Sequence, residues 1–240
     1  MKASLESGCN FWNAGEFYGT PEYNSLHLME KYFIKYPEDA SKVVLSIKGG
    51  LNNMVPDGSP AGIRRSVDNC LKLLKGMKSI DIFEMARVDH KTPLETTFKV
   101  LEEYVEAGKI GGIALSEVNA TTIKKAAGIT KIVAVEVEVS LFSTHIFENG
   151  VAAACAEHNI PIVAYSPLSG GFLTGDLKSL DDIPEGDFRR MLPRFYPENF
   201  HINLEIVEEV KKLASQKGCT TPQIAINWAR CQSKKVSLPR

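Results

Sequence analysis

The sequence predicts an α/β fold, a parallel (β/α)8 barrel that forms a single domain over residues 1–240. Short apolar segments alternate with longer segments of helical periodicity, which is the pattern of a parallel sheet whose strands are joined by helices. Segments 43–47 and 160–164 are apolar on both sides, as strands covered by helices are. The sequence has no Gly-x-Gly-x-x-Gly at the start of a first helix, so an open dinucleotide-binding sheet is the weaker interpretation.

Six complete strands are predicted, each paired with a helix. The strands are residues 9–13, 43–48, 80–86, 112–116, 134–141 and 160–166, with a partial strand at 236–239. The helices are residues 26–36, 59–74, 94–107, 120–127, 150–157, 204–217 and 222–231. A complete barrel needs eight strands. Because the chain begins near the end of a helix at 2–7 and ends inside a strand, we expect a barrel without its first strand and without the segment after its eighth.

Local signals support these boundaries. Each predicted strand is a short apolar run between polar or glycine residues. Ser59-Pro60 supplies a cap and a proline at the first helical position, and Gly108 follows the helix at 94–107 as a C-terminal cap. The stretch 168–200 is rich in glycine and proline, and irregular stretches of that length are usually binding loops or lids.

Composition is that of a soluble globular enzyme. Of 240 residues, 44% are hydrophobic and 24% charged, and the net charge is -1, so neither nucleic acid nor a membrane surface is an expected partner. The sequence shows neither a signal peptide nor a transmembrane run. The five cysteines and the histidines lack metal-ligand spacing, so no metal site is predicted. We expect reduced thiols, a cytoplasmic or nuclear location, and a monomer or weak homo-oligomer.

A tyrosine and a lysine follow two of the predicted strands. Tyr18 lies just after the first strand, and Lys48 ends the second. In a parallel barrel the carboxyl ends of the strands meet at one rim, so both side chains are expected there. A lysine ammonium stabilises a phenolate, which makes a neighbouring tyrosine a proton donor to a carbonyl oxygen.

Five segments in order resemble motifs of the aldo-keto reductase family. They are Asn-Ala-Gly-Glu-Phe-Tyr-Gly at 13–19, the strand regions at 81–89, 108–117 and 134–142, and Ala-Tyr-Ser-Pro-Leu with the glycine-rich run at 164–175. Together they span nearly the whole chain. The spellings at 13–19 and 86–91 are most similar to the subgroup of fungal pyridoxal reductases.

The resemblance implies reversible, NADPH-dependent reduction of an aldehyde, with pyridoxal converted to pyridoxine. The implied catalytic residues are Tyr18 as the proton donor, Lys48 beside it, and Asn13. The implied NADP(H)-binding residues are Ser116, Glu117 and Glu136 at the carboxamide, Tyr165 stacked on the nicotinamide, and Ser166, Leu168, Gly170, Gly171 and Leu173 at the pyrophosphate. The implied substrate residues are Trp12, Ala86, Arg87 and Phe142.

Three positions depart from the family pattern. Asn13 stands where the family has an aspartate, Ala86 where it has a histidine, and Glu136 where it has a glutamine that holds the carboxamide. Asn13 cannot neutralise Lys48, so we expect another counter-charge. Glu84 shares strand parity with Ala86 and is predicted to point into the barrel. Without a counter-charge, Lys48 would stabilise the Tyr18 phenolate more strongly.

Two other functions stay open at this point. One is a general reductase of aromatic and aliphatic aldehydes, for which the space left at Ala86 is equally suitable. The other is a barrel that binds the cofactor without turnover, as a sensor or scaffold. The altered residues Asn13 and Ala86 favour that reading, whereas the retained Tyr18 and Lys48 oppose it.

Overall fold

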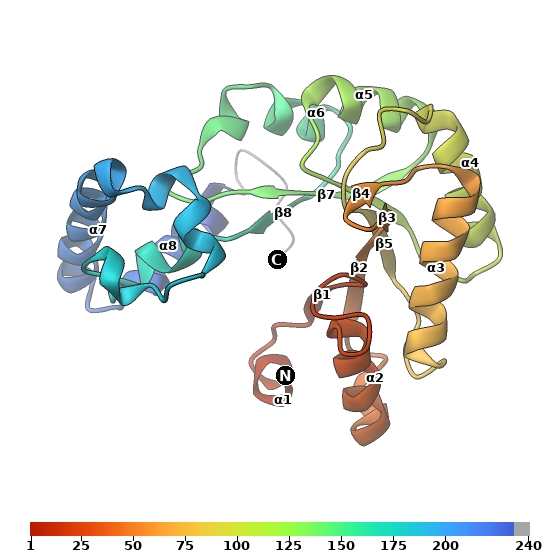
Figure 1. Ribbon diagram of the computed structural model, residues 1–240, viewed down its shortest axis with the longest axis horizontal. Coiled ribbons are helices and arrows are strands. Elements are labelled where there is room, and N and C mark those ends of the chain that lie inside the picture. Colours follow the sequence, from red (N-terminus) through yellow and green to blue (C-terminus); the bar gives the residue numbers. More distant parts are fainter. Residues whose placement is uncertain (233–240) are drawn as a thin grey trace.

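The computed structural model describes residues 1–232, and its main sheet is a curled, parallel part-barrel (Figure 1). The strand order within this six-stranded sheet is β1-β2-β5-β6-β7-β8. The strands are β1 (Phe11–Gly15), β2 (Val44–Gly49), β5 (Ile82–Met85), β6 (Ile113–Ser116), β7 (Ile132–Glu138) and β8 (Ile162–Tyr165). The predicted parallel α/β architecture is confirmed, and the predicted partial strand at 236–239 lies outside the described residues.

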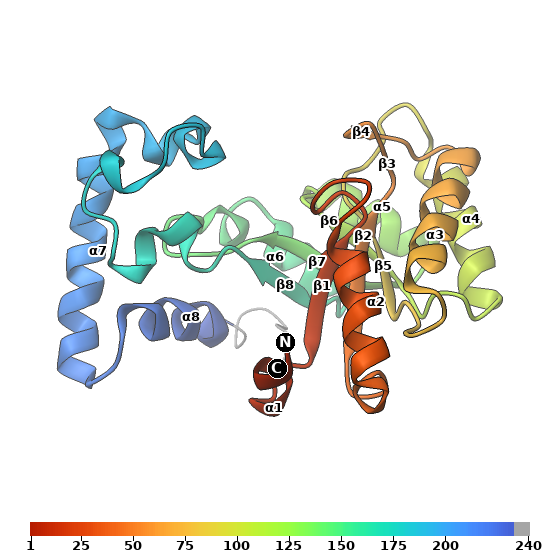
Figure 2. The ribbon, with the colours of Figure 1, turned by 60° about the horizontal axis from the view of Figure 1, so that its bottom comes forward.

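Helices alternate with the strands; those within residues 25–157 lie on the outer face of the sheet, and the two that follow residue 196 lie apart from it (Figures 1 and 2). They are α1 (Lys2–Glu6), α2 (Ser25–Lys35), α3 (Pro60–Leu74), α4 (Leu94–Glu106), α5 (Ala120–Ile129), α6 (Val151–Glu157), α7 (Pro197–Lys217) and α8 (Thr221–Cys231). As predicted, α3 begins after Ser59, whose side chain accepts a hydrogen bond from the Gly62 N–H, with Pro60 at the first helical position.

The main core lies between the sheet and these helices. Leu45, Ile47 and Phe83 point outward from their strands and are fully buried against Ile63 of α3 and Phe98 of α4. Burying one such side chain contributes roughly 1.5–3 kcal/mol. The opposite parity of each strand faces the interior of the curl, so every strand divides into a packing face and an inner face.

Residues 169–231 form a second body, which we call the C-terminal lobe (Figure 1, cyan to blue). Short 3₁₀ turns η3 (Ser169–Thr174), η4 (Leu180–Asp182), η5 (Phe188–Met191) and η6 (Pro193–Phe195) precede α7 and α8. The lobe has its own apolar cluster around Phe172, whose ring centroid lies 4.6 Å from that of Phe195 and 4.9 Å from that of Phe200.

Several predicted boundaries need correction. β1 runs over Phe11–Gly15 and not over 9–13, because Cys9 and Asn10 belong to the exposed turn after α1 and the ladder begins at the Phe11–Val44 pair. β7 ends at Glu138, three residues before the predicted end, because Ser140 and Ser143 close a tight turn through two backbone hydrogen bonds.

The last two helices also differ from the prediction. α7 begins at Pro197, seven residues before the predicted start, and α8 begins at Thr221. Pro197 occupies the first turn of α7, which is a standard helix-start signal that the reading of 168–200 as wholly irregular overlooked.

One small element was not predicted. β3 (Leu51–Asn52) and β4 (Val55–Pro56) form a short antiparallel hairpin after β2. Its turn residues Asn53 and Met54 both have positive φ, at 47° and 63°, as a type I′ turn requires. Methionine in that position gives no turn signal, which explains why the sequence did not reveal the hairpin. Among the helices of residues 1–232, none is long and apolar enough to cross a membrane.

Candidate active site

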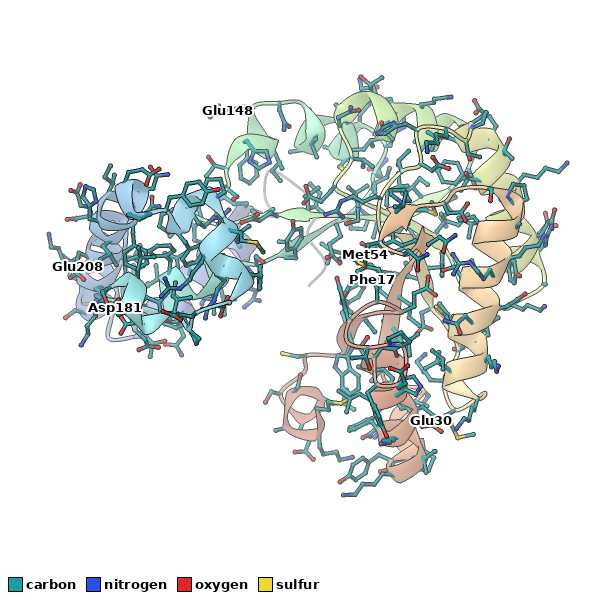
Figure 3. The ribbon with its side chains drawn as sticks, in the orientation of Figure 1. Phe17, Glu30, Met54, Glu148, Asp181 and Glu208 are labelled. Carbon is teal, nitrogen blue, oxygen red and sulfur yellow. The ribbon has the colours of Figure 1, made fainter. Side chains whose placement is uncertain are left out.

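The carboxyl ends of the strands surround a cavity of about 440 Å³ on the inner side of the sheet. It brings together many of the residues singled out from the sequence. The lining residues are Phe11, Asn13, Phe17, Tyr18, Lys48, Arg87, Ser116, Glu136, Val163, Ala164, Tyr165 and Ser166. Phe17, labelled in Figure 3, comes from the loop after β1.

The loop after β1 presents Tyr18 to this cavity. The Ser25 N–H donates to the Tyr18 carbonyl over 2.9 Å, and the Ser25 hydroxyl accepts from the Gly15 N–H over 2.9 Å. Gly19, at φ +125°, allows the close return of the chain, since a Cβ there would lie 2.3 Å from the Tyr23 carbonyl oxygen. The Tyr18 side chain remains accessible, with 42% of the residue exposed. Its hydroxyl can therefore meet a ligand in the cavity.

Lys48 lies buried between the rings of two tyrosines. Its Nζ is 5.9 Å from the ring centroid of Tyr18 and 5.6 Å from that of Tyr165. The expected approach of Tyr18 and Lys48 at one rim is therefore observed. Burial works against the ammonium form, but the carboxylates of Glu84 and Glu136 outweigh it and raise the pKa of Lys48. Lys48 is held as a cation.

Glu136 is the main counter-charge of Lys48. One carboxylate oxygen, Oε1, accepts from Lys48 Nζ, and the other, Oε2, accepts from Asn13 Nδ2 over 2.6 Å. Asn13 thus reaches Lys48 only through Glu136. Each Glu136 oxygen thus already accepts one hydrogen bond within the protein, and the expected contact of Glu136 with a cofactor carboxamide stays a prediction.

Glu84 supplies a second carboxyl beside the same ammonium. Its Oε1 lies 3.5 Å from Lys48 Nζ, and both residues are buried. The two are direct partners in the register of β2 and β5. The prediction that Glu84 points into the barrel toward Lys48 is confirmed. A Lys48 without any counter-charge is not what the structure shows.

The sequence profile described as the aldo/keto reductase family matches residues 1–239. The chain belongs to this family. A protein of Schizosaccharomyces pombe named "Probable pyridoxal reductase 2" is 42% identical over 246 residues, covering 100% of this chain and 74% of that protein. An aldo-keto reductase of the same yeast, whose name carries NADP(+), is 39% identical over 97% of this chain and 70% of its own length.

A solved structure supports the fold independently. The glycerol dehydrogenase of Gluconobacter oxydans matches with a TM-score of 0.87 at 24% identity, over 99% of this chain and 72% of that one. The curled six-stranded sheet is therefore a half-barrel of the (β/α)8 fold. Members of this family are oxidoreductases that act on small carbonyl compounds with a nicotinamide cofactor.

In this aldo-keto reductase, three of the residues expected at the cofactor, Ser116, Tyr165 and Ser166, lie close together. All three line the cavity, and Ser116 is buried, with its hydroxyl 3.4 Å from Arg87 Nη1. Burial first, and then the nearby Glu117 carboxylate, raise the pKa of Tyr165, so its ring stays an uncharged phenol. An uncharged aromatic face and a buried hydroxyl fit a nicotinamide ring and its carboxamide.

The predicted pyrophosphate residues Leu168, Gly170, Gly171 and Leu173 lie in and beside η3, away from the cavity lining. Gly170 and Gly171 have φ of +69° and +105°, which glycine adopts without strain. The Arg189 guanidinium donates to the Gly170 carbonyl over 3.0 Å and would be close to a phosphate bound there. Leu173 is fully buried in the lobe, so only its backbone could serve a cofactor.

Glu117 is also turned away from the cavity. It has a left-handed φ of 52°, and its Oε1 accepts from the Glu138 N–H over 2.9 Å. The carboxylate therefore ties the end of β6 to the end of β7. That contact fixes the backbone beside Ser116, and the expected direct contact of Glu117 with the carboxamide stays a prediction.

Three of the four expected substrate residues lie outside the cavity lining. Trp12 is only 8% exposed and packs against Tyr32 and Phe33, because its parity on β1 is opposite to that of Asn13. Phe142 packs on Phe172 of the lobe, with ring centroids 5.6 Å apart. Trp12 and Phe142 therefore pack away from this cavity, contrary to the placement expected from the sequence.

Ala86 and Arg87 follow β5 directly. Ala86 is buried, and its N–H donates to the Gly49 carbonyl over 3.0 Å, so its methyl group leaves space where the family has a histidine. Arg87 lines the cavity as expected, with its Nη1 donating to the Ala86 carbonyl over 2.5 Å. A guanidinium therefore stands beside the position of the missing imidazole.

One partner of Glu84 and two residues that line the cavity were not identified from the sequence. Ser46 donates to Glu84 Oε2 over 3.2 Å, and Val163 and Phe11 line the cavity. Ser46 shares the parity of Lys48, and Val163 that of Tyr165, so strict period-two counting from known inward residues would have found them.

Proposed function

We propose that this aldo-keto reductase catalyses the NADPH-dependent reduction of an aldehyde, with pyridoxal as substrate and pyridoxine as product, and that the reaction is reversible. The observation that carries the proposal is the meeting of Tyr18, Lys48 and Glu136 at one cavity lined also by Ser116 and Tyr165. The 42% identity to a protein named as a pyridoxal reductase supports the substrate, and the relative whose name carries NADP(+) supports the cofactor.

The chain's own residues provide the proton chemistry. A bound nicotinamide would supply the hydride for the carbonyl carbon. Tyr18 donates the proton that the carbonyl oxygen takes up, and the Lys48 ammonium stabilises the phenolate left behind. Glu136 holds Lys48 in place, and Asn13 holds Glu136. Proton transfer by a positioned side chain contributes about 10²–10⁴-fold to a rate.

Arg87 supplies a hydrogen-bond donor near the position where the family has a histidine. Its guanidinium lines the cavity beside Ala86 and Ser116 and is the donor that a substrate oxygen meets there. A cation at this place favours a substrate that carries a negatively charged oxygen near its aldehyde, as a ring with an ionised hydroxyl does. Pyridoxal has such a hydroxyl beside the aldehyde, and nitrobenzaldehyde does not.

The test uses the purified chain, NADPH and either pyridoxal or nitrobenzaldehyde. We expect a higher kcat/KM for pyridoxal, and a loss of about 10²–10⁴-fold in Tyr18→Phe. Tyr23→Phe, in the same loop but 73% exposed, is the matched control and should keep the rate.

The two alternative functions give different results. Equal kcat/KM for both aldehydes would identify a general aldehyde reductase. A change in NADPH fluorescence on binding, with no oxidation of NADPH at saturating aldehyde, would identify a cofactor-binding protein and overturn the proposal.

A further inference from the structure

Glu84 is a buried carboxyl that the proposed reaction does not use. Only 2% of the residue is exposed, and its Oε1 is the one buried side-chain polar atom in residues 1–232 without a hydrogen-bond partner. Lys48 Nζ is near it at 3.5 Å, but bonds to Glu136 instead. A buried polar atom left without a partner costs about 1–3 kcal/mol, so its retention beside the reacting groups calls for a reason.

Groups from several elements lie around this carboxyl and the ammonium beside it. β2 contributes Lys48 and Ser46, whose hydroxyl donates to Glu84 Oε2 over 3.2 Å, and β7 contributes Glu136. The charged or titratable groups of the adjoining cavity are Tyr18, Arg87 and Tyr165, and β1 contributes the neutral Asn13. Close to Glu84 there is thus one cation, Lys48, for two carboxyl groups.

The protonation of Glu84 follows from this arrangement. Burial, and then repulsion by the Glu136 carboxylate, raise the pKa of Glu84 to about 8, against the smaller opposing effects of Lys48 and Ser46. At neutral pH the carboxyl therefore holds a proton, and Lys48 pairs with Glu136 one to one. As the pH rises through about 8, a second negative charge forms 3.5 Å from Lys48 Nζ.

We propose that Glu84 is a positioning residue that acts through Lys48. When Glu84 ionises, its negative charge partly offsets the Lys48 ammonium, so Lys48 stabilises the Tyr18 phenolate less. The inference rests on the proton-donor role of Tyr18 in the proposed function. Aldehyde reduction needs Tyr18 protonated, whereas alcohol oxidation needs it as phenolate. Ionised Glu84 therefore favours reduction over oxidation in alkaline solution.

The deciding measurement is a spectrophotometric titration of the Tyr18 phenolate, without substrate or cofactor. The signal of Tyr18 is obtained by subtracting the titration curve of the matching Tyr18→Phe protein from that of each protein. In Glu84→Gln, which keeps the shape but cannot ionise, we expect phenolate formation at a pH lower by about one unit than in the parent protein. Glu30→Gln, on α2 away from the cavity (Figure 3), is the control and should leave the titration unchanged.

A second variant keeps the inference testable if Glu84→Gln does not fold. Ser46→Ala removes the hydroxyl that supports ionised Glu84, so the phenolate midpoint should fall in the same direction by a smaller amount. An unchanged or raised midpoint in whichever of the two variants folds overturns the proposal. Because the titration needs no aldehyde, its outcome is separate from any failure to reduce pyridoxal.

Thermal unfolding gives an independent readout. A carboxyl whose pKa is raised on folding binds its proton more tightly in the native state, so stability falls as the pH rises from about 4.5 through 8. The Tm of the parent protein should decline over that range more than the Tm of Glu84→Gln. Parallel Tm curves would show that Glu84 is already ionised at neutral pH and would contradict the proposal.

Discussion

We call the main sheet with helices α2 to α6 the half-barrel. The half-barrel and the C-terminal lobe differ in the kind of side chain that they bury. The half-barrel buries Lys48, Glu84 and Glu136 on its inner face, together with hydroxyl groups such as that of Ser116. The lobe buries aromatic rings around Phe172 and holds few polar groups inside. The buried charged groups thus lie in the sheet that helices α2 to α6 cover. The interior of the lobe is mainly apolar, and the lobe carries the glycine loop.

Side-chain polar contacts of Ser169 and Arg194 join the regions, and one of them is a hydrogen bond from Arg194 to the Ser143 hydroxyl over 3.2 Å. Ser169 of the lobe donates to the Ser140 hydroxyl over 2.8 Å, and both residues are buried. Arg194 of the lobe contacts Glu138 at the end of β7 over 2.7 Å. The glycine loop 170–171 starts beside the Ser169 contact, so its position relative to the cavity depends on how the lobe docks. We therefore expect variants in the half-barrel to change the chemistry, and variants in the lobe to change cofactor affinity.

The largest effect should come from the half-barrel. Lys48→Met leaves Glu84 and Glu136 buried without a cation, which should lower the free energy of unfolding by about 3–5 kcal/mol and turnover by more than about 10²-fold. Chemical denaturation and NADPH oxidation measure the two losses. Lys212→Met, in an exposed ion pair with Glu209, is the control. If Lys48→Met turned over normally, the chemistry would not depend on the half-barrel's buried charges.

The next effect belongs to the lobe. Phe172→Ala removes the ring at the centre of the aromatic cluster, and we expect a loss of about 3–5 kcal/mol in unfolding free energy. Where the variant folds, the KM for NADPH should rise while the Tyr18 phenolate titration stays in place. Phe188→Ala, an exposed position, should change stability by no more than about 0.5 kcal/mol. A shift in the Tyr18 titration would show that the two regions are not independent.

The smallest effect is expected at the joint. Arg194→Ala breaks a partly buried ion pair at the surface, so the free energy of unfolding should fall by only about 1 kcal/mol. Equilibrium denaturation and NADPH affinity would be measured together. A large loss of NADPH affinity with little loss of stability would show that Arg194 positions the lobe. An unchanged affinity would indicate that the contact of Ser169 positions it instead.

The fold was largely predictable, because its signals are local. Alternation of apolar runs and helical stripes gave the strand–helix order, and the cap at Ser59 gave the start of α3. The errors also have local causes. The early start of α7 was marked by Pro197, and the position of Trp12 by its parity relative to Asn13. The β3–β4 hairpin had no such mark, since Met54 adopts a positive φ without a turn-forming side chain.

The sequence by itself determined that Tyr18 and Lys48 reach one rim, because parallel strands end on the same edge and side chains alternate with period two. It also placed Glu84 on the inner face. Only the tertiary structure decided that Glu136 binds Lys48. β5 and β6 lie between β7 and β2 in the sheet, so this contact depends on the curl that brings distant strands face to face. That curl arises from the accumulated twist of the whole sheet, which no local pattern of residues records.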